Sequence, residues 1–154
     1  MKRIFIAFML MVAATSAVLA QNGLKINQIF TGDYASDPDV TMTIMSGESR
    51  YLTSHHLTVL ATFKGPSGTY AKTLAPLVLA DGSKAVGRNV RYKNGELYYA
   101  FYALPKVKVG KQELNRYLYY VNNGSQKHKR VTMVYFEGKI TQEEATRLIR
   151  TFRQ

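Results

Sequence analysis

Three histidines, His55, His56 and His128, are the side chains of this chain best suited to metal binding or proton transfer. Successive residues of a strand point to opposite faces, so His55 and His56 cannot both ligate one ion without an irregular backbone. His128 lies in the basic run Lys127-His128-Lys129-Arg130, whose charges repel a metal cation. We therefore expect solvated or hydrogen-bonded histidines and no metal site.

Acidic side chains cluster once, at Asp33, Asp37 and Asp39. Their odd spacing suggests a calcium loop, but the central glycine and the terminal glutamate of that loop are missing. Short acidic side chains are typical of turns and caps, where they accept hydrogen bonds from the backbone. The sequence therefore predicts a structural role for these carboxylates.

Motifs for covalent or nucleotide-dependent catalysis are missing. The chain has no cysteine, which excludes a thiol nucleophile, a Cys-ligated metal and a disulfide framework. It has no G-x-S-x-G turn, no G-x-x-x-x-G-K-S/T and no G-x-G-x-x-G, and the Gly-Pro-Ser-Gly segment over 65–68 is interpreted as a turn. We predict a protein that is not an enzyme and needs no cofactor. A small hydrolase built from the histidines and scattered acids is the least favoured alternative.

Tyrosine and basic residues are concentrated in the second half. Eight of the eleven tyrosines lie between residues 92 and 135, interleaved with arginine and lysine. In a regular strand Tyr98 and Tyr102 share one face and Tyr99 the other, so some rings are expected on a face that no helix covers. Such rings can stack on sugars or bases while cations bind phosphate, sulfate or uronate groups. The candidate binding surface comprises Arg88, Arg91, Tyr98, Tyr102, Arg116, Lys127, Lys129 and Arg130.

Two simpler interpretations of the same residues stay open. Tyrosine is a good strand residue with an apolar ring and a wet hydroxyl, so its concentration can reflect core packing. The basic run over 127–130 can be a solvated hairpin tip.

The formal charge of the 154 residues is +11, from 21 basic and 10 acidic side chains. The charge is uneven, because residues 84–154 carry fifteen basic and five acidic groups whereas residues 21–83 carry four and five. With 46% hydrophobic and 20% charged residues, the composition excludes an intrinsically disordered chain. The surplus of cations favours an anionic partner.

The first twenty residues have the three parts of a secretory signal peptide. Lys2 and Arg3 precede an apolar run over 4–14, and small residues including Ala17 lead to Ala20. That run is too short for a spanning helix, which needs roughly 20 residues, and no later segment is long and apolar enough. We predict a signal peptide over 1–20, cleaved after Ala20, and a single globular domain over 21–154.

Export restricts the location and the partners. The mature protein is expected in the periplasm or outside the cell. A lipid anchor is excluded because no cysteine follows the apolar run, and no nucleic-acid partner is expected.

Hydrophobic spacing predicts the elements of the first half. Ile26, Ile29 and Phe30 suit a short helix over 24–30, followed by a turn-rich connector over 33–39. Alternation of β-branched residues predicts a strand over 40–44. Residues 51–63 fit either a helical stripe or a strand, and we favour a short turn of helix followed by a strand.

Turn and capping signals predict the second half. Lys93-Asn94-Gly95-Glu96 suits a type I′ turn, which predicts a hairpin of strands 86–92 and 97–104, the second ending before Pro105. A second hairpin joins 116–121 to 131–136 through a polar loop over 122–125. Thr141 and Glu144 form a capping box that opens a C-terminal helix. Its apolar stripe is Ala145, Leu148, Ile149 and Phe152, and Arg147, Arg150 and Arg153 suit its C-terminal dipole.

Consecutive strands joined by tight turns indicate an antiparallel sheet. The predicted fold class is α+β. We expect one twisted antiparallel sheet of four to six strands, with the N- and C-terminal helices packed on one face.

Three segments in order carry a family resemblance: the run over 97–105 (Leu-Tyr-Tyr-Ala-Phe-Tyr-Ala-Leu-Pro), then Asn115-Arg116-Tyr117-Leu118, then Val134-Tyr135-Phe136-Glu137-Gly138 before a short helix. Over 24–152 the chain resembles small exported domains of unknown function from Bacteroidota. The resemblance implies an exported single α+β domain in a Gram-negative envelope. It implies no catalytic or binding residue.

The sequence therefore favours a non-enzymatic, exported envelope domain. Its basic, tyrosine-bearing second half would bind an anionic or sugar-containing polymer or another envelope protein. The alternative is a structural or assembly component that pairs through an exposed sheet edge. The sequence does not indicate an oligomeric state.

Overall fold

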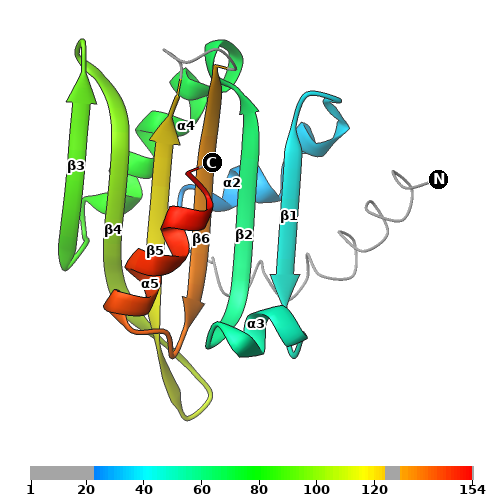
Figure 1. Ribbon diagram of the computed structural model, residues 1–154, viewed down its shortest axis with the longest axis vertical. Coiled ribbons are helices and arrows are strands. Elements are labelled where there is room, and N and C mark those ends of the chain that lie inside the picture. Colours follow the sequence, from blue (N-terminus) through cyan, green and yellow to red (C-terminus); the bar gives the residue numbers. More distant parts are fainter. Residues whose placement is uncertain (1–22, 124–128, 154) are drawn as a thin grey trace.

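The computed structural model describes residues 23–123 and 129–153, which form one antiparallel sheet with helices on both sides (Figure 1). The six strands lie in the order β1-β2-β6-β5-β4-β3. This confirms the α+β class and the single antiparallel sheet. The strands are β1 (Thr41–Ser46), β2 (Leu57–Pro66), β3 (Gly87–Lys93), β4 (Glu96–Val109), β5 (Gln112–Asn122) and β6 (Arg130–Gly138). The helices are α2 (Asn27–Phe30), a 3-10 turn η1 (Asp33–Ser36), α3 (Arg50–Ser54), α4 (Ser67–Gly82) and α5 (Gln142–Thr151).

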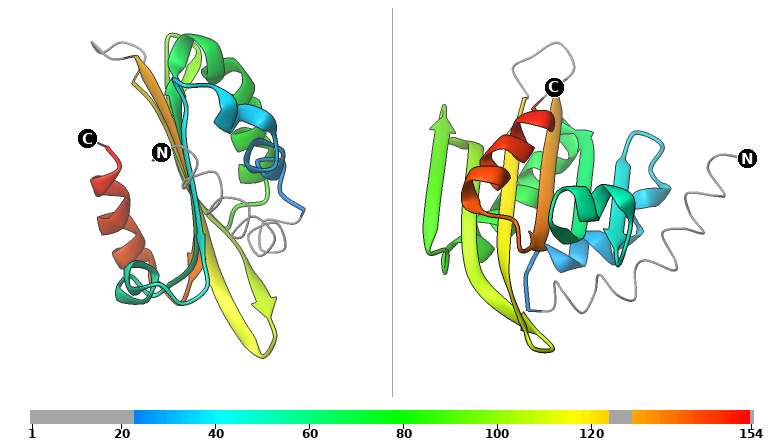
Figure 2. Two further views of the ribbon diagram at one scale, coloured as in Figure 1. Left: turned by 90° about the vertical axis from the view of Figure 1, so that its right-hand side faces the viewer. Right: turned by 60° about the horizontal axis from the view of Figure 1, so that its bottom comes forward.

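Helices cover both faces of the sheet, so the prediction that both terminal helices share one face is wrong. Figure 2 shows α2 and α4 on one side and α3 and α5 on the other. The reason is that the central strands are apolar on both faces: on β5, Tyr120 faces α4 while Tyr119 faces α5. A sheet with two apolar faces needs a covering layer on each.

The longest helix, α4, begins where the sequence predicted only a turn. β2 runs to Pro66 and the helix starts at the next residue. Its buried residues Tyr70, Leu74 and Val78 recur every four positions and face the sheet. Near its end the helix packs so closely that a Cβ on Gly82 would lie 2.2 Å from the Tyr102 ring.

The predicted hairpins are present. Asn94 and Gly95 have φ values of 52° and 76°, as the type I′ turn between β3 and β4 requires. β4 continues beyond the predicted stop, because an irregularity between Leu104 and Val107 accommodates Pro105. β5 and β6 pair as predicted; residues 124–128 of the connecting loop lie outside the described residues.

The remaining elements also follow the sequence. β1, α3 and β2 match the strand and the helix-then-strand interpretation, and α2 covers part of the expected helix. The capping box of α5 is present, with the Glu144 amide 3.2 Å from the Thr141 hydroxyl and the Thr141 amide 2.8 Å from the Glu144 carboxylate. The predicted signal peptide over 1–20 lies outside the described residues. None of the described helices has the length and apolar character needed to cross a membrane.

Candidate functional site

Most tyrosines of the second half belong to the hydrophobic core. Tyr102, Tyr120 and Tyr135 are buried on the α4 face, and Tyr99, Tyr117 and Tyr119 on the α5 face. Tyr92, which is 59% exposed, and the partly buried Tyr98 are the exceptions among those described. The core-packing interpretation of the tyrosine concentration is therefore confirmed for the buried six.

A bulge in β4 changes which rings share a face. Arg91 pairs with Tyr99 and Tyr92 pairs with Leu97, which leaves Tyr98 as an extra residue. A bulge shifts the alternation by one position, so Tyr98 packs with Tyr99 on the α5 face. The prediction that Tyr98 and Tyr102 share a face is wrong. Tyr102, 3% exposed beneath Gly82, has no ring face open to a ligand.

Three cations gather around Tyr98 and Tyr99 at the rim of the α5 face. The Arg91 guanidinium carbon, on edge strand β3, lies 5.6 Å from the Tyr99 ring centroid. Arg153, just beyond α5, places its guanidinium carbon 5.3 Å from the same centroid. Lys93 Nζ lies 5.9 Å from the Tyr98 centroid. We call these five residues the cationic cluster.

The local sequence explains how each element positions its cation near the Tyr99 ring. The Asn94-Gly95 turn fixes the β3–β4 register that sets Arg91 opposite Tyr99. The apolar stripe of α5 seats that helix on the sheet and leaves Arg150 and Arg153 on its flank at the end where the helix dipole favours cations. Arg153 reaches β4 from there.

The two arginines of the cluster have no acidic partner in the described parts of the chain. Ion pairs in that part of the chain join His56 with Glu144, at 3.1 Å, and Arg147 with Glu143, at 4.0 Å. Arg91 and Arg153 lie within 5.6 Å of one ring centre and carry the same charge. A cation–π contact returns only about 0.5–1 kcal/mol at an exposed site. An anion between the arginines would remove their mutual repulsion.

Tyr119 supports this rim from within the core. Its fully buried ring packs edge-on against Tyr99, with centroids 5.7 Å apart. Its hydroxyl makes no hydrogen bond of ordinary geometry with another described residue. Burial raises the pKa of this hydroxyl to about 12, while the nearby Arg153 guanidinium acts in the opposite direction. The two guanidinium groups are charged donors, which suits an anionic acceptor, whereas the buried Tyr119 hydroxyl is not accessible to one.

The other predicted site residues lie elsewhere. Arg88 is exposed on β3, and its Nη2 donates to the Ala85 carbonyl at 3.2 Å. Arg116 is on the α4 face, where its Nε donates to the Pro105 carbonyl at 2.7 Å. Lys129 and Arg130 lie at the β5–β6 hairpin, and Lys127 is outside the described residues. The eight residues therefore do not form one surface, although Arg91 and Tyr98 belong to the cationic cluster.

Beneath α4, a group of buried charges is satisfied within the fold. Glu137, 1% exposed, accepts from the Tyr135 hydroxyl at 2.5 Å and lies opposite Arg116 in the β5–β6 register. Asp81, 8% exposed, accepts from the backbone amides of Lys25 and Ile26 at 2.7 and 2.9 Å. Burial raises the pKa of both carboxyls, and the Arg116 charge opposes that rise. Asp81 therefore ties the N-terminal segment to α4, while the Glu137 contacts stay within the sheet.

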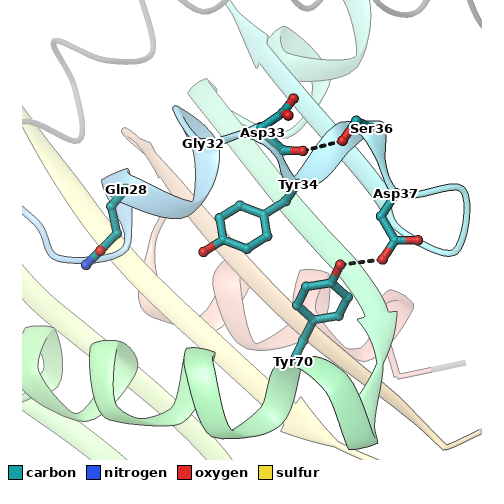
Figure 3. Close-up of a pocket in the computed structure, with 7 residues that line it drawn as sticks. All are labelled: Gln28, Gly32, Asp33, Tyr34, Ser36, Asp37 and Tyr70. Atoms are coloured by element: carbon teal, nitrogen blue, oxygen red, sulfur yellow. Dashed lines mark hydrogen bonds between the residues drawn. The ribbon is translucent and has the colours of Figure 1, made fainter.

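An open hollow of about 480 Å³ lies beside the N-terminal segment. Tyr70 donates to Asp37 across it, while the Asp33 carboxylate points away from both tyrosine rings (Figure 3). The Asp39 amide donates to Asp37 at 2.9 Å, which confirms the predicted turn role of Asp37. The carboxylates do not converge as an acid–base pair would. The hollow is lined by Gln28, Gly32, Asp33, Tyr34, Ser36, Asp37 and Tyr70.

His55 and His56, the histidines among the described residues, make separate contacts, and His128 lies outside those residues. His55 packs against Tyr51, with ring centroids 4.6 Å apart. His56 Nδ1 lies 3.1 Å from Glu144 Oε1, but Glu144 also caps α5 and His56 is exposed. Within residues 23–123 and 129–153, no three His, Asp or Glu side chains come close enough to hold a metal ion.

Comparison with known proteins gives a family but no activity. No curated protein matches the chain significantly, and no solved structure does. A family model matches residues 13–149, which is most of the chain. The protein thus belongs to DUF6108, a family of unknown function.

Proposed function

We propose that this protein is a non-enzymatic binding domain of the cell envelope whose cationic cluster holds an anionic polymer. The polymer would carry phosphate, sulfate or uronate groups on a sugar backbone. The observation that carries the proposal is the Arg91–Tyr99–Arg153 arrangement, in which two guanidiniums share one ring without a carboxylate partner in the described residues. A bound anion would supply that partner.

The rest of this edge favours a polymer over a single small anion. Arg91 and Lys93 are exposed on β3, and Arg88 adds an exposed cation on the opposite face of the same edge strand. Lys106 and Lys108 on β4 and Lys111 at the next turn extend the row of exposed cations toward the far end of the sheet. A chain with repeating negative charges can contact several of these positions, whereas one small anion can contact only the cluster.

Export to the envelope is part of the proposal. It rests on the order of charges, apolar residues and small residues over 1–20, and on the resemblance to exported domains of Bacteroidota. Fractionation of cells followed by N-terminal sequencing tests it. We expect the mature protein in the periplasm or the medium and starting at Gln21; a full-length protein in the cytoplasm would contradict export.

Binding is tested with heparin and polygalacturonate as probes and neutral dextran as the blank. In the variant Arg91→Gln/Arg153→Gln, heparin affinity should fall about tenfold or more for each arginine, since a hydrogen bond to a charged group contributes roughly 1.5–3 kcal/mol. Added salt should weaken wild-type binding, because the screening length at physiological ionic strength is about 8 Å.

The matched control is Lys72→Gln/Lys139→Gln, which removes the same charge from two exposed positions away from the cluster. It should bind heparin nearly as well as the wild type. Equal losses of heparin affinity in both double variants would show that net charge, and not the cationic cluster, determines binding. Unchanged binding in the arginine variant, or equal binding of dextran, would refute the proposed site.

A further inference from the structure

The two edges of the sheet differ in how they are protected. Strand edges expose unpaired backbone groups, and proteins usually protect them with charges, bulges or a cover. β3, at one edge, carries Arg88, Arg91 and Lys93 and has irregular pairing with β4. β1, at the other edge, reads Thr-Met-Thr-Ile-Met-Ser, has no charged residue or proline, and pairs with β2 without a register shift (Figure 1).

The pairing with β2 shows which backbone groups of β1 point outward. The Gly47 amide donates to the Thr58 carbonyl at 3.2 Å, in continuation of the β1–β2 register. Alternate residues of an antiparallel strand direct their amide and carbonyl to opposite sides. The odd-numbered residues therefore face β2, and the outward groups belong to Met42, Ile44 and Ser46.

We propose that β1 pairs antiparallel with β1 of a second copy of this chain, on a two-fold axis at Ile44. Met42, Ile44 and Ser46 then meet Ser46, Ile44 and Met42 of the second copy, so every outward group of the strand finds a partner. Side chains on the same face meet as Thr43 against Met45, with no charge on either side.

The uncharged sequence of β1 allows it to pair with a second copy of itself. A two-fold pairing of β1 brings no like charges together along the strand. The same pairing of β3 would bring Arg88, Arg91 and Lys93 against themselves, which opposes association. Self-association through β1 therefore leaves β3, the opposite edge strand, outside the dimer interface.

The dimer has one consequence that rests on the proposed function. A two-fold axis perpendicular to the sheet keeps both α5 faces on the same side of the joined sheet. Because neighbouring strands lie about 4.8 Å apart, the two cationic clusters would be roughly 50 Å apart. A long anionic polymer could contact both, and the gain in affinity would depend on polymer length.

Sedimentation equilibrium of the mature protein tests the dimer over micromolar concentrations. The wild type should show the mass of a dimer, and Thr43→Lys/Ser46→Pro, which adds a charge and removes an outward donor at β1, should be a monomer. Asn89→Lys adds the same charge at the exposed edge of β3 and should remain a dimer. A monomeric wild type, or equal loss of dimer in both variants, would overturn the proposal.

Disulfide trapping covers the case in which the β1 variant fails to fold. The chain has no cysteine, so Thr43→Cys/Met45→Cys introduces the sole thiols. The proposed register places the thiol at position 43 opposite the thiol at position 45 of the second copy. These positions form a non-hydrogen-bonded pair, whose Cα separation of about 4.5 Å suits a disulfide. Mild oxidation should give a covalent dimer, whereas Asn89→Cys should stay mostly monomeric. Equal cross-linking at both edges, or none at β1, would refute the β1 pairing.

The dimer and the binding site can fail independently. A wild-type protein that is monomeric but still binds heparin would refute this inference alone. Loss of binding in the arginine variant of a protein that stays dimeric would support both.

Discussion

Arginines on the two faces of the sheet have different surroundings. Arg116, on the α4 face, donates to the Pro105 carbonyl and lies opposite Glu137. Arg91 and Arg153, at the rim of the α5 face, share the Tyr99 ring and lack a carboxylate partner among the described residues. A charge whose partners lie within the fold contributes to stability, and a charge without one is available to a ligand. We therefore expect substitutions at Arg116 to affect folding and those at the cluster to affect binding.

The largest difference should be in stability. Arg116→Ala removes the guanidinium that donates to the Pro105 carbonyl and lies opposite the buried Glu137, and loss of a hydrogen bond from a charged group costs about 1.5–3 kcal/mol. Arg153→Ala should change the free energy of unfolding by less than about 0.5 kcal/mol, as is usual for an exposed side chain. Urea unfolding of both variants measures the difference. Equal losses would contradict the distinction between the faces.

Removing the hydroxyl from each of two buried tyrosines should have different effects on stability. Tyr135→Phe removes the hydroxyl that donates to Glu137, and an unsatisfied buried acceptor costs about 1–3 kcal/mol. Tyr119→Phe removes a hydroxyl without a regular hydrogen bond to a described residue, so stability should be unchanged or slightly higher. Heparin affinity should also change little in Tyr119→Phe, because the buried hydroxyl does not reach the surface. A large stability loss there would show that the hydroxyl serves the core.

The pH dependence of stability should have opposite signs for two glutamates. Burial raises the pKa of Glu137, so its contribution to stability is complete below its ordinary pKa, near 4.5, and is lost as the pH rises through the folded-state pKa. Hydrogen bonds from Thr141 lower the pKa of Glu144, so its contribution is present above that value and is lost as the pH falls through its folded-state pKa.

Unfolding curves of Glu137→Gln and Glu144→Gln across the acidic range test these signs. The first variant should lose less stability than the wild type as the pH rises above 4.5. The second should lose less as the pH falls below 4.5. Identical pH profiles for the two variants would contradict the assignment of opposite shifts.

The smallest expected effect is at the cap of α5, the helix that positions Arg153. Thr141→Ala removes the hydroxyl that accepts from the Glu144 amide and should cost about 1 kcal/mol. Heparin affinity should change little at temperatures where the helix stays folded. A binding loss as large as that of Arg153→Gln would mean that helix position, and not the arginine, limits binding.

Local signals in the sequence predicted the local parts of the fold. Asn94-Gly95 defined a hairpin and Thr141 with Glu144 a helix start, because each depends on residues a few positions apart. The helix α4 was missed, since apolar residues lie on most of its sides and Pro76 is inside it. The layering of the helices was also missed, because it depends on the two-sided burial of β5 and β6.

The candidate site was only partly predictable, because it also depends on contacts between distant parts of the chain. Arg91 and Tyr98 were identified from their own segment, but the bulge that turns Tyr98 toward Tyr99 has no clear sequence signal. Arg153 was assigned to the helix dipole, because its approach to Tyr99 is a tertiary contact between distant parts of the chain. Tyr102 was wrongly included in the candidate binding surface. Its ring is buried under α4, a helix that the sequence did not reveal.

Titration of the isotopically labelled mature protein with a heparin oligosaccharide, followed by NMR, tests the central claim most directly. We expect the largest shifts at the Nε–Hε groups of Arg91 and Arg153 and at the Tyr98 and Tyr99 amides, with Arg116 unaffected. Shifts concentrated at the basic hairpin over 127–130, or no saturable shift at all, would contradict it.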